Sequence, residues 1–305
     1  MRNLLQICQK EIYIKIKLSL RLDNVSDQTT NRYNDKTVGE KSFSISGDNK
    51  VLVGGVNKDF PEQGRRVVIL MNQNGDHERA YEHDQHKQPI FTLHRSITHT
   101  SNGNIHVVDV VSDYRRRVLV LGQGGDKINI YTGDKEINKD RQFYPTDIVT
   151  TPRDNVIVAD MFTDTLHILN NAGLLMTYYK TSDINIVFPC SLSFTPTGQL
   201  YIGCNTPWTP LGRDTEINKD RPFYPTDIVT THRDNVIVAD MFTDTLHILN
   251  NAGLLMTYYK TSDINIMLPY SLAFSPTGTL YIGCTRTKGN TTNENKIYEV
   301  TISRC

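Results

Sequence analysis

The chain has 305 residues, and its 33 Lys and Arg residues balance 33 Asp and Glu residues, so the formal net charge at pH 7 is +0. This balance argues against a protein that binds nucleic acid over its whole surface, because such proteins carry a basic excess. A chain of this length can form two average domains or one large all-β domain.

The cysteines and the apolar runs indicate the compartment. The five cysteines are odd in number and no pair has CxxC spacing, which favours reduced thiols over a disulfide framework or a zinc site. No run approaches the ~18 apolar residues of a membrane span. The N-terminus lacks the charge-free apolar core of a signal peptide. We therefore expect a cytoplasmic protein that does not bind a membrane.

The first predicted element in chain order is a strand over residues 12–22. Every even position from Ile12 to Leu22 is Ile or Leu, and every odd position between them is Tyr, Lys, Ser or Arg. Alternation with period 2 over this length fits a strand better than a helix. Left unpaired, such a strand is an aggregation-prone edge. We therefore expect it to pair with the last predicted strand, Lys296–Ile302.

Two units with a common internal pattern follow, near residues 42 and 96. In the first, "SFSISGDNKVLVGG" precedes "RRVVILMNQNGDHERAY", and in the second "SITHTSNGNIHVVD" precedes "RRVLVLGQGGDKINIY". Each phrase joins β-rich runs through Gly, Asn or Asp, which is the chemistry of a β-hairpin. The pattern predicts short antiparallel strands in each unit.

The second half of the chain contains a near-exact duplication with a period of 80 residues. Residues 136–204 and 216–284 differ at eight of 69 positions, and "RDNVIVADMFTDTLHILNNAGLLMTYYKTSDINI" occurs in both copies without a change. Each copy contains four β-rich runs separated by turn residues. Four short strands form a sheet that cannot bury both of its faces alone, whereas sheets stacked radially can, and this arrangement is a β-propeller.

The fold class predicted from these repeats is an all-β propeller of about six units. The units start near residues 42, 96, 147, 191, 227 and 271. Only ten residues separate Cys204 from the loop over Thr215–Asp220, which leaves no space for two outer strands. We therefore predict that the unit starting at Ser191 is truncated, and that the N-terminal strand completes the last unit.

Several phrases resemble a known repeat family. A buried strand ending in Asp, then "hhhL", then N-x-x-G-x-x-x-x-x-Y is similar to the NHL repeat. "RRVVILMNQNGDHERAYEHDQHKQPIF", "FYPTDIVTTPRDNVIVAD" and "KIYEVTISRC" resemble the C-terminal NHL propeller of tripartite-motif (TRIM) proteins. The resemblance implies a propeller domain over residues 41–305 after an N-terminal segment over residues 1–40. It also implies a non-enzymatic domain that recognises a protein or RNA target on a propeller face.

The chain lacks other parts of that family. TRIM proteins carry RING and B-box zinc modules, but the first 40 residues hold one cysteine, Cys8, and no histidine. Zinc modules need clusters of both residues. One alternative is that the chain is a fragment of a TRIM-type ubiquitin ligase whose zinc modules are missing. A second alternative, from another class of protein, is a propeller hydrolase. The chain has no heptad pattern of a coiled coil, so the oligomeric state stays open.

Arginines at equivalent places in two neighbouring units form a candidate ligand-binding rim. Arg65, Arg66, Arg115 and Arg116 lie where a loop enters the third strand of its unit. A basic rim on one face of the ring could bind phosphate or an acidic peptide. Acidic residues stand nearby, so a solvated charged loop is the competing interpretation.

The remaining polar residues do not predict a catalytic, cofactor-binding or metal site. His77, His83 and His86 span a strand end and a loop, so their side chains need not converge on a metal. Asp147 and Asp227 open innermost strands and could face a central channel, where propeller hydrolases bind calcium. Their sister units carry Ser at the same place, so a ring of carboxylates is not evident. We therefore expect no enzyme and no cofactor.

Overall fold

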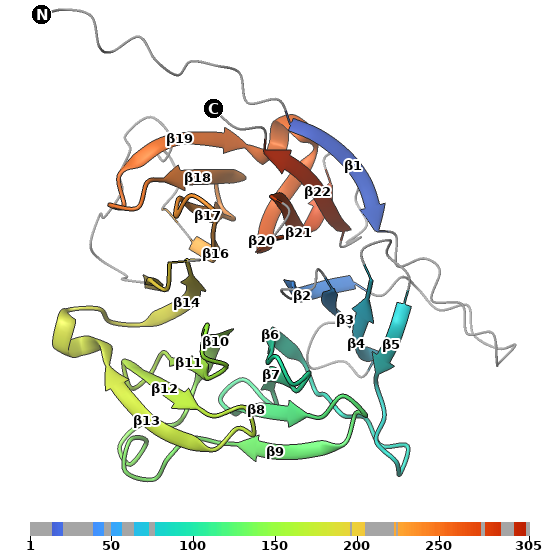
Figure 1. The fold of residues 1–305 in the computed structure, drawn as a ribbon, viewed down its shortest axis with the longest axis vertical. Helices are drawn as coiled ribbons and strands as arrows, with labels where there is room; N and C mark the ends of the chain where they lie inside the picture. The colour runs from blue at the N-terminus through green and yellow to red at the C-terminus, as the bar shows by residue number, and fades with distance from the viewer. Residues whose placement is uncertain are drawn as a thin grey trace, which may run out of the picture.

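A computed structural model describes residues 14–20, 39–45, 50–56, 64–72, 77–195, 197–204, 223, 225–275, 278–287 and 296–302. In these residues, five four-stranded antiparallel sheets and one two-stranded sheet stand in a ring (Figure 1). The innermost strands contact one another in succession around the ring, and the last returns to the first. The fold is a β-propeller. The prediction of an all-β propeller with about six units is confirmed, and the unit expected to be truncated has two strands in the described residues.

Each sheet extends outward from an innermost strand. In that order, the strands of the six sheets are β2 (Gly39–Ile45), β3 (Val51–Val56), β4 (Arg66–Met71) and β5 (His77–Tyr81); β6 (His94–His99), β7 (Ile105–Val110), β8 (Arg116–Leu121) and β9 (Lys127–Tyr131); β10 (Pro145–Thr150), β11 (Val156–Asp160), β12 (Thr165–Leu169) and β13 (Leu175–Lys180); β14 (Pro189–Phe194) and β15 (Leu200–Cys204); β16 (Pro225–Thr230), β17 (Val236–Asp240), β18 (Thr245–Leu249) and β19 (Leu255–Lys260); and β20 (Ile266–Phe274), β21 (Thr279–Thr287), β22 (Lys296–Ile302) and β1 (Ile14–Leu20).

Two short 3-10 helices, η2 (Thr181–Ile184) and η3 (Thr261–Ile264), follow the outer strands of the duplicated blades. In the part of the chain that the structure describes, no helix is both long enough and apolar enough to cross a membrane.

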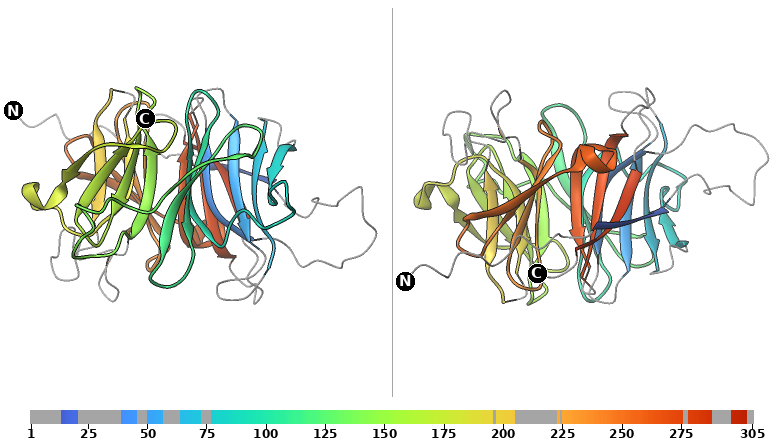
Figure 2. Two further views of the ribbon diagram at one scale, coloured as in Figure 1. Left: turned by 90° about the horizontal axis from the view of Figure 1, so that it is seen from below. Right: turned by 90° about the horizontal axis from the view of Figure 1, so that it is seen from above.

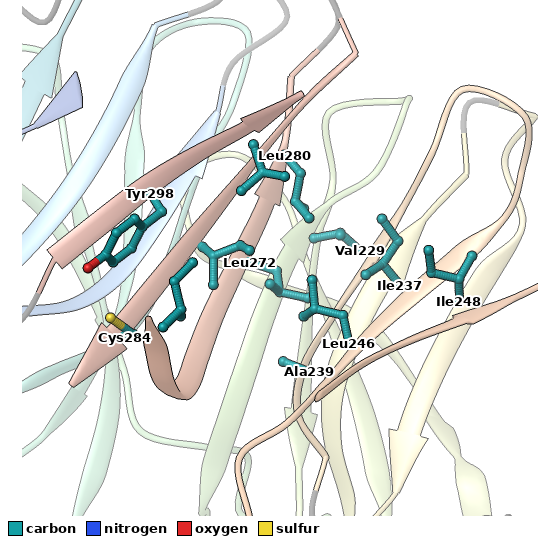
Figure 3. Close-up of a cluster of buried hydrophobic side chains, with 12 residues drawn as sticks. Val229, Ile237, Ala239, Leu246, Ile248, Leu272, Leu280, Cys284 and Tyr298 are labelled. Carbon is teal, nitrogen blue, oxygen red and sulfur yellow. The ribbon is translucent and has the colours of Figure 1, made fainter. Parts of the chain in front are cut away.

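The hydrophobic core lies between neighbouring blades. Seen from the side, the sheets stand face to face around the ring (Figure 2). In each complete duplicated blade the second strand, "VIVAD", is buried at every position because a neighbouring blade covers each of its faces. Figure 3 shows one interblade cluster, in which Ile237 and Leu246 of one blade pack with Leu272 and Leu280 of the next. Each blade is therefore stabilised mainly by its two neighbours.

The first and last described strands share one sheet. β1 pairs antiparallel with β22, with Ile14 opposite Ile302 and Leu20 opposite Ile297. β1 thereby becomes the outermost strand of the blade that begins with β20. The division of the chain into a segment over residues 1–40 and a domain over 41–305 stays a prediction.

Candidate functional site

Every innermost strand carries a β-bulge near its start. In each case one residue has no partner on the second strand, and the next residue restores the register. A bulge re-aims side chains, and bulges are common beside active sites. The unpaired residues are Lys41, Arg95, Thr146, Cys190, Thr226 and Tyr270. The residues that follow them are Ser42, Ser96, Asp147, Ser191, Asp227 and Ser271.

The bulged ends of five of these strands surround a cavity of about 180 Å³ in the centre of the ring. Its chemically active lining residues are Arg95, Ser96, Asp147, Cys190, Asp227, Tyr270 and Ser271. The cavity therefore places a guanidinium, two carboxyls, a thiol and several hydroxyls around one small space.

Asp147 joins three innermost strands. One carboxylate oxygen, Oδ2, accepts the Leu192 N–H at 2.6 Å, and the other, Oδ1, accepts the Ile148 N–H at 2.8 Å and the Ser96 hydroxyl. Burial raises the pKa of Asp147, while these donors and the nearby Arg95 guanidinium act in the opposite direction.

Asp227 occupies the equivalent place in the second copy. Its Oδ2 accepts the Leu272 N–H at 2.7 Å, and its Oδ1 accepts the Ile228 N–H at 2.8 Å. Burial, and then the nearby Asp147 carboxylate, raise the pKa of Asp227 to about 8. At neutral pH this carboxyl therefore holds a proton.

The two carboxyls differ because their neighbours differ. The inner strand before Asp147 offers Arg95 at its bulge, whereas the inner strand before Asp227 offers Cys190 at the same place. Burial, followed by the effect of Asp147, raises the pKa of the Cys190 thiol to about 12, so it is neutral and supplies no charge. Among the side chains that the structure describes, one member of the carboxyl pair thus has a cation beside it and the other does not.

Arg95 and Tyr270 line the same cavity from different blades. Arg95 donates through Nε to the Thr146 carbonyl at 3.2 Å and through Nη1 to the Tyr270 hydroxyl at 3.2 Å. A guanidinium held by two bonds is an ordered donor for negative charge. Arg95, Cys190 and Tyr270 were not recognised from the sequence, although each directly precedes a Ser or Asp at the start of an inner strand.

The expected arginine rim is engaged in separate contacts. The Arg65 guanidinium pairs with Glu82 at 3.0 Å, and the buried Arg66 donates to the Thr92 carbonyl at 2.9 Å. Arg115 is exposed. Arg116 reaches the Pro145 carbonyl at 3.0 Å. A rim built by all four arginines stays a prediction.

Metal-binding geometry is not found in the described residues, where no three His, Cys, Asp or Glu side chains gather as ligands would. In the histidine-rich loop, Asp84 accepts the backbone N–H groups of His86 and Gln88, each at 2.9 Å, and pairs with Lys127 at 3.1 Å. The carboxylate of this loop is therefore used to hold the loop together.

No family model matches the chain, and no curated protein matches it. Solved structures do. A catalytically inactive virginiamycin B lyase from Staphylococcus aureus, crystallised with quinupristin, has a TM-score of 0.55 at 14% identity and covers 94% of this chain and 88% of its own. A gluconolactonase from Xanthomonas campestris has a TM-score of 0.56 at 12% identity and covers 88% of each chain. A luciferin-regenerating enzyme has a TM-score of 0.55 at 14% identity, covering 88% of this chain and 92% of its own.

These comparisons correct one expectation. The sequence favoured a non-enzymatic recognition domain of the TRIM type, but the three similar propellers are by their names a lyase, a lactonase and a luciferin-regenerating enzyme. The expectation of a non-enzymatic TRIM-type domain is therefore wrong. At 14% identity or less, the likeness itself establishes the propeller fold.

Proposed function

We propose that the chain is a propeller enzyme that hydrolyses a small ester or lactone in its central cavity. The observation that carries the proposal is the carboxyl pair, in which two Asp residues from identical strands share one cavity and have different neighbours. When the environments of two titratable groups push their pKa values apart, the groups are suited to act as acid and base.

Asp147 is suited to the role of general base. Arg95 and three hydrogen-bond donors favour its ionised form and oppose the rise in its pKa that burial causes. In the proposed reaction Asp147 takes a proton from a water molecule while the water oxygen attacks the substrate carbonyl carbon. General base catalysis of this kind contributes typically 10²–10⁴-fold.

Asp227 is suited to the role of general acid. Because its pKa is about 8, it holds a proton at neutral pH. When the bond between the carbonyl carbon and the alkoxy oxygen breaks, Asp227 gives this proton to the leaving oxygen. The carbonyl oxygen carries negative charge before that bond breaks, and Arg95 is the cation in the cavity that can stabilise it.

The fold likeness supports the choice of reaction class. The gluconolactonase is named for action on a lactone and supports this class, whereas the virginiamycin B lyase supports only the proposal that the chain is an enzyme. Other expectations stay predictions, namely the NHL-type repeat, a protein or RNA partner on a propeller face, and a cytoplasmic location.

The test is turnover by the purified chain on a panel of chromogenic esters and lactones. We expect hydrolysis whose rate falls as the pH rises through about 8, where Asp227 loses its proton. Asp147→Asn and Asp227→Asn should each lower kcat by roughly 10²-fold or more. Asp183→Asn and Asp263→Asn are matched controls, since these exposed residues are another duplicated acidic pair and should leave kcat unchanged. Equal rates in the cavity variants and the controls would refute the assignment.

A further inference from the structure

We infer that Arg95 and Arg116 form an anion site at the bulged end of the central cavity, and that this site holds the carboxylate or phosphate group of a small molecule. The inference names the substrate class of the proposed enzyme and in that respect rests on the proposed function. The site itself is supported by contacts that do not depend on any reaction.

The two guanidinium groups are held at successive carbonyls and lie near enough that, in addition to burial, repulsion by Arg95 lowers the pKa of Arg116. Arg116 donates through Nη1 to the Pro145 carbonyl at 3.0 Å, and Arg95 donates through Nε to the carbonyl of the next residue, Thr146, at 3.2 Å. Successive carbonyls at the start of β10 therefore hold one arginine each. Two like charges from different strands of one blade are thereby held at the start of β10, where Arg95 and Thr146 line the cavity.

Aromatic side chains fix both arginines in place. The Arg116 guanidinium carbon lies 3.6 Å from the centroid of the Tyr144 ring, and Arg116 Nη2 donates to the Tyr144 hydroxyl. Tyr144 in turn stacks on Phe162, with ring centroids 4.1 Å apart and an interplanar angle of 18°. Arg95 is held by the Tyr270 hydroxyl. A site ordered before binding loses less entropy when a ligand arrives.

Neither arginine forms a salt bridge within the described residues, although the effect of burial on Arg95 is opposed by the nearby Asp147, which raises the pKa of Arg95. The described ion pairs engage Arg65 with Glu82 and Arg117 with Asp109, but none includes Arg95 or Arg116. Asp147 lies near Arg95, yet its hydrogen bonds go to other donors.

Arg116 has an unused hydrogen-bond donor and an unfavourable charge neighbour. Its Nε is buried without a hydrogen-bond partner. Burial, and then repulsion by Arg95, lower the pKa of Arg116 to about 10. An anion between the two groups would remove the repulsion and accept charge-assisted hydrogen bonds.

The chemistry of the donors defines the ligand. The planar donor array of a guanidinium matches a carboxylate or a phosphate, with geometric preference as well as charge. The cavity of about 180 Å³ limits the ligand to a small molecule. The carbonyl to be attacked would extend from the anion site toward Asp147 and Asp227, which line the same cavity.

The experiment measures binding without turnover. Inorganic phosphate and acetate are titrated into the full chain by calorimetry, with methyl acetate as a neutral probe. We expect binding of at least one anion and none of the neutral probe, and comparison of the two anions shows which group the site prefers. Arg95→Gln and Arg116→Gln should each weaken anion binding roughly tenfold, the usual effect of losing a charge-assisted hydrogen bond.

Arg115→Gln is the matched control, since it removes an adjacent but exposed arginine and should leave anion binding within about twofold, as expected of a surface charge. Arg116→Lys keeps the charge but lacks the planar donors, so it should bind the anion with intermediate strength. Intermediate binding would show that the loss in Arg116→Gln comes from the missing charge and not from misfolding. No anion binding by the unaltered chain, or equal binding by Arg95→Gln, Arg116→Gln and Arg115→Gln, would overturn the inference.

Asp227→Asn separates this inference from the proposed function. If the enzyme proposal holds, this variant loses hydrolysis but still binds the anion. Anion binding in a chain that hydrolyses no ester or lactone would support the site and refute the reaction. Hydrolysis and anion binding that are both indifferent to Arg116→Gln would support the reaction and refute the site, since Arg116, unlike Arg95, has no role in the proposed reaction.

Discussion

Asp147 and Asp227 illustrate how position in the ring gives identical residues different chemistry. Each stands in the sequence "FYPTDIVTT", yet one faces Arg95 across the blade boundary and the other faces Cys190. The proton affinity of a side chain is set by burial and neighbouring charge more than by its own local sequence.

The raised pKa of Asp227 predicts that stability depends on pH. The pKa is about 8 in the folded chain against an ordinary value of 3.8, so the folded state binds a proton that the unfolded state releases. The stabilisation from this group is complete below about 3.8 and is lost as the pH rises through about 8. Melting temperatures measured from about pH 5 to pH 9 should fall toward the alkaline end.

Asp227→Asn cannot ionise and should flatten this alkaline decline, whereas Asp263→Asn, at an exposed position of η3, should leave it unchanged. If Asp227→Asn and the unaltered chain declined in parallel, the carboxyl would not be the group that titrates. Burial also raises the pKa of Asp147, so Asp147→Asn should change the alkaline decline in the same direction.

At the scale of elements, the duplicated blades provide an internal comparison. Leu169 of β12 is fully buried, with 0% of its surface exposed, and packs with Val108, Val118 and Val120 of the preceding complete blade. Leu249 of β18 has the same local sequence but is only partly buried beside Tyr201 of the two-stranded sheet. The short sheet therefore covers its neighbour less completely than a full blade does.

We predict that Leu169→Ala lowers the free energy of unfolding by about 2–5 kcal/mol, the usual cost of a cavity at a fully buried leucine. Leu249→Ala should cost less, because fewer contacts are lost. Urea unfolding of both variants measures the difference. Equal losses would mean that β14 and β15 pack as tightly against their neighbour as a complete blade does.

Strand β1 carries a second prediction at this scale. Removal of residues 1–24 leaves the edge of β22 without the strand that pairs with it. We expect a melting temperature lower by several degrees, since each kcal/mol lost shifts it by roughly 2–4 °C in chains somewhat smaller than this one. We also expect aggregation through the exposed edge.

The control for this truncation is removal of residues 1–11 alone, which keeps β1 whole and should have no effect. If the chain without residues 1–24 kept the melting temperature of the unaltered chain, β22 would close the ring without β1.

The propeller fold could be predicted from the sequence because the repeated residues make contacts that every blade needs. Asp160 ends a buried strand and accepts the Tyr144 N–H at 2.9 Å, which holds the segment leading into the blade. Asn170 accepts the N–H of Ala172 at 3.0 Å and of Leu174 at 2.9 Å, and Gly173 adopts a φ of 77° to complete the hairpin. Any four-stranded blade needs such hydrogen bonds and turns, so these residues indicate a propeller but do not indicate its activity.

The site was less predictable for a geometric reason. Asp147 and Asp227 could be placed at the start of inner strands, but Arg95 and Tyr270 reach the cavity through bulges. A bulge is defined by how two strands pair, so it cannot be predicted from the sequence of one strand alone. The pairing of the two carboxyls across blades likewise depends on closure of the ring.

At the scale of the whole molecule, the ring is uneven. Five sheets have four strands, and the sheet of β14 and β15 has two in the described residues. Every residue of β11 is buried, whereas every residue of β15 is only partly buried. Local stability follows burial and contact density, so the two-stranded sheet is expected to be the least stable part of the ring.

Hydrogen exchange followed by mass spectrometry should show this difference. Amides of Leu200–Cys204 should exchange faster than those of Val156–Asp160 and Val236–Asp240, the second strands of its neighbours. Similar protection in all three strands would mean that the two-stranded sheet is as stable as its four-stranded neighbours.

The exact repetition of residues 153–186 and 233–266 has a consequence for how the chain finds its native state. β10 and β16 are also identical, so β11 can form the same ladder with either strand, and β17 can do likewise. Conformers with exchanged partners keep native-like hydrogen bonds and must open again before they can correct themselves, which is a kinetic trap typical of repeat proteins. We expect refolding from denaturant to show a slow phase that prolyl isomerase does not accelerate. A single fast return to the native state would mean that the loops alone distinguish one copy from the other.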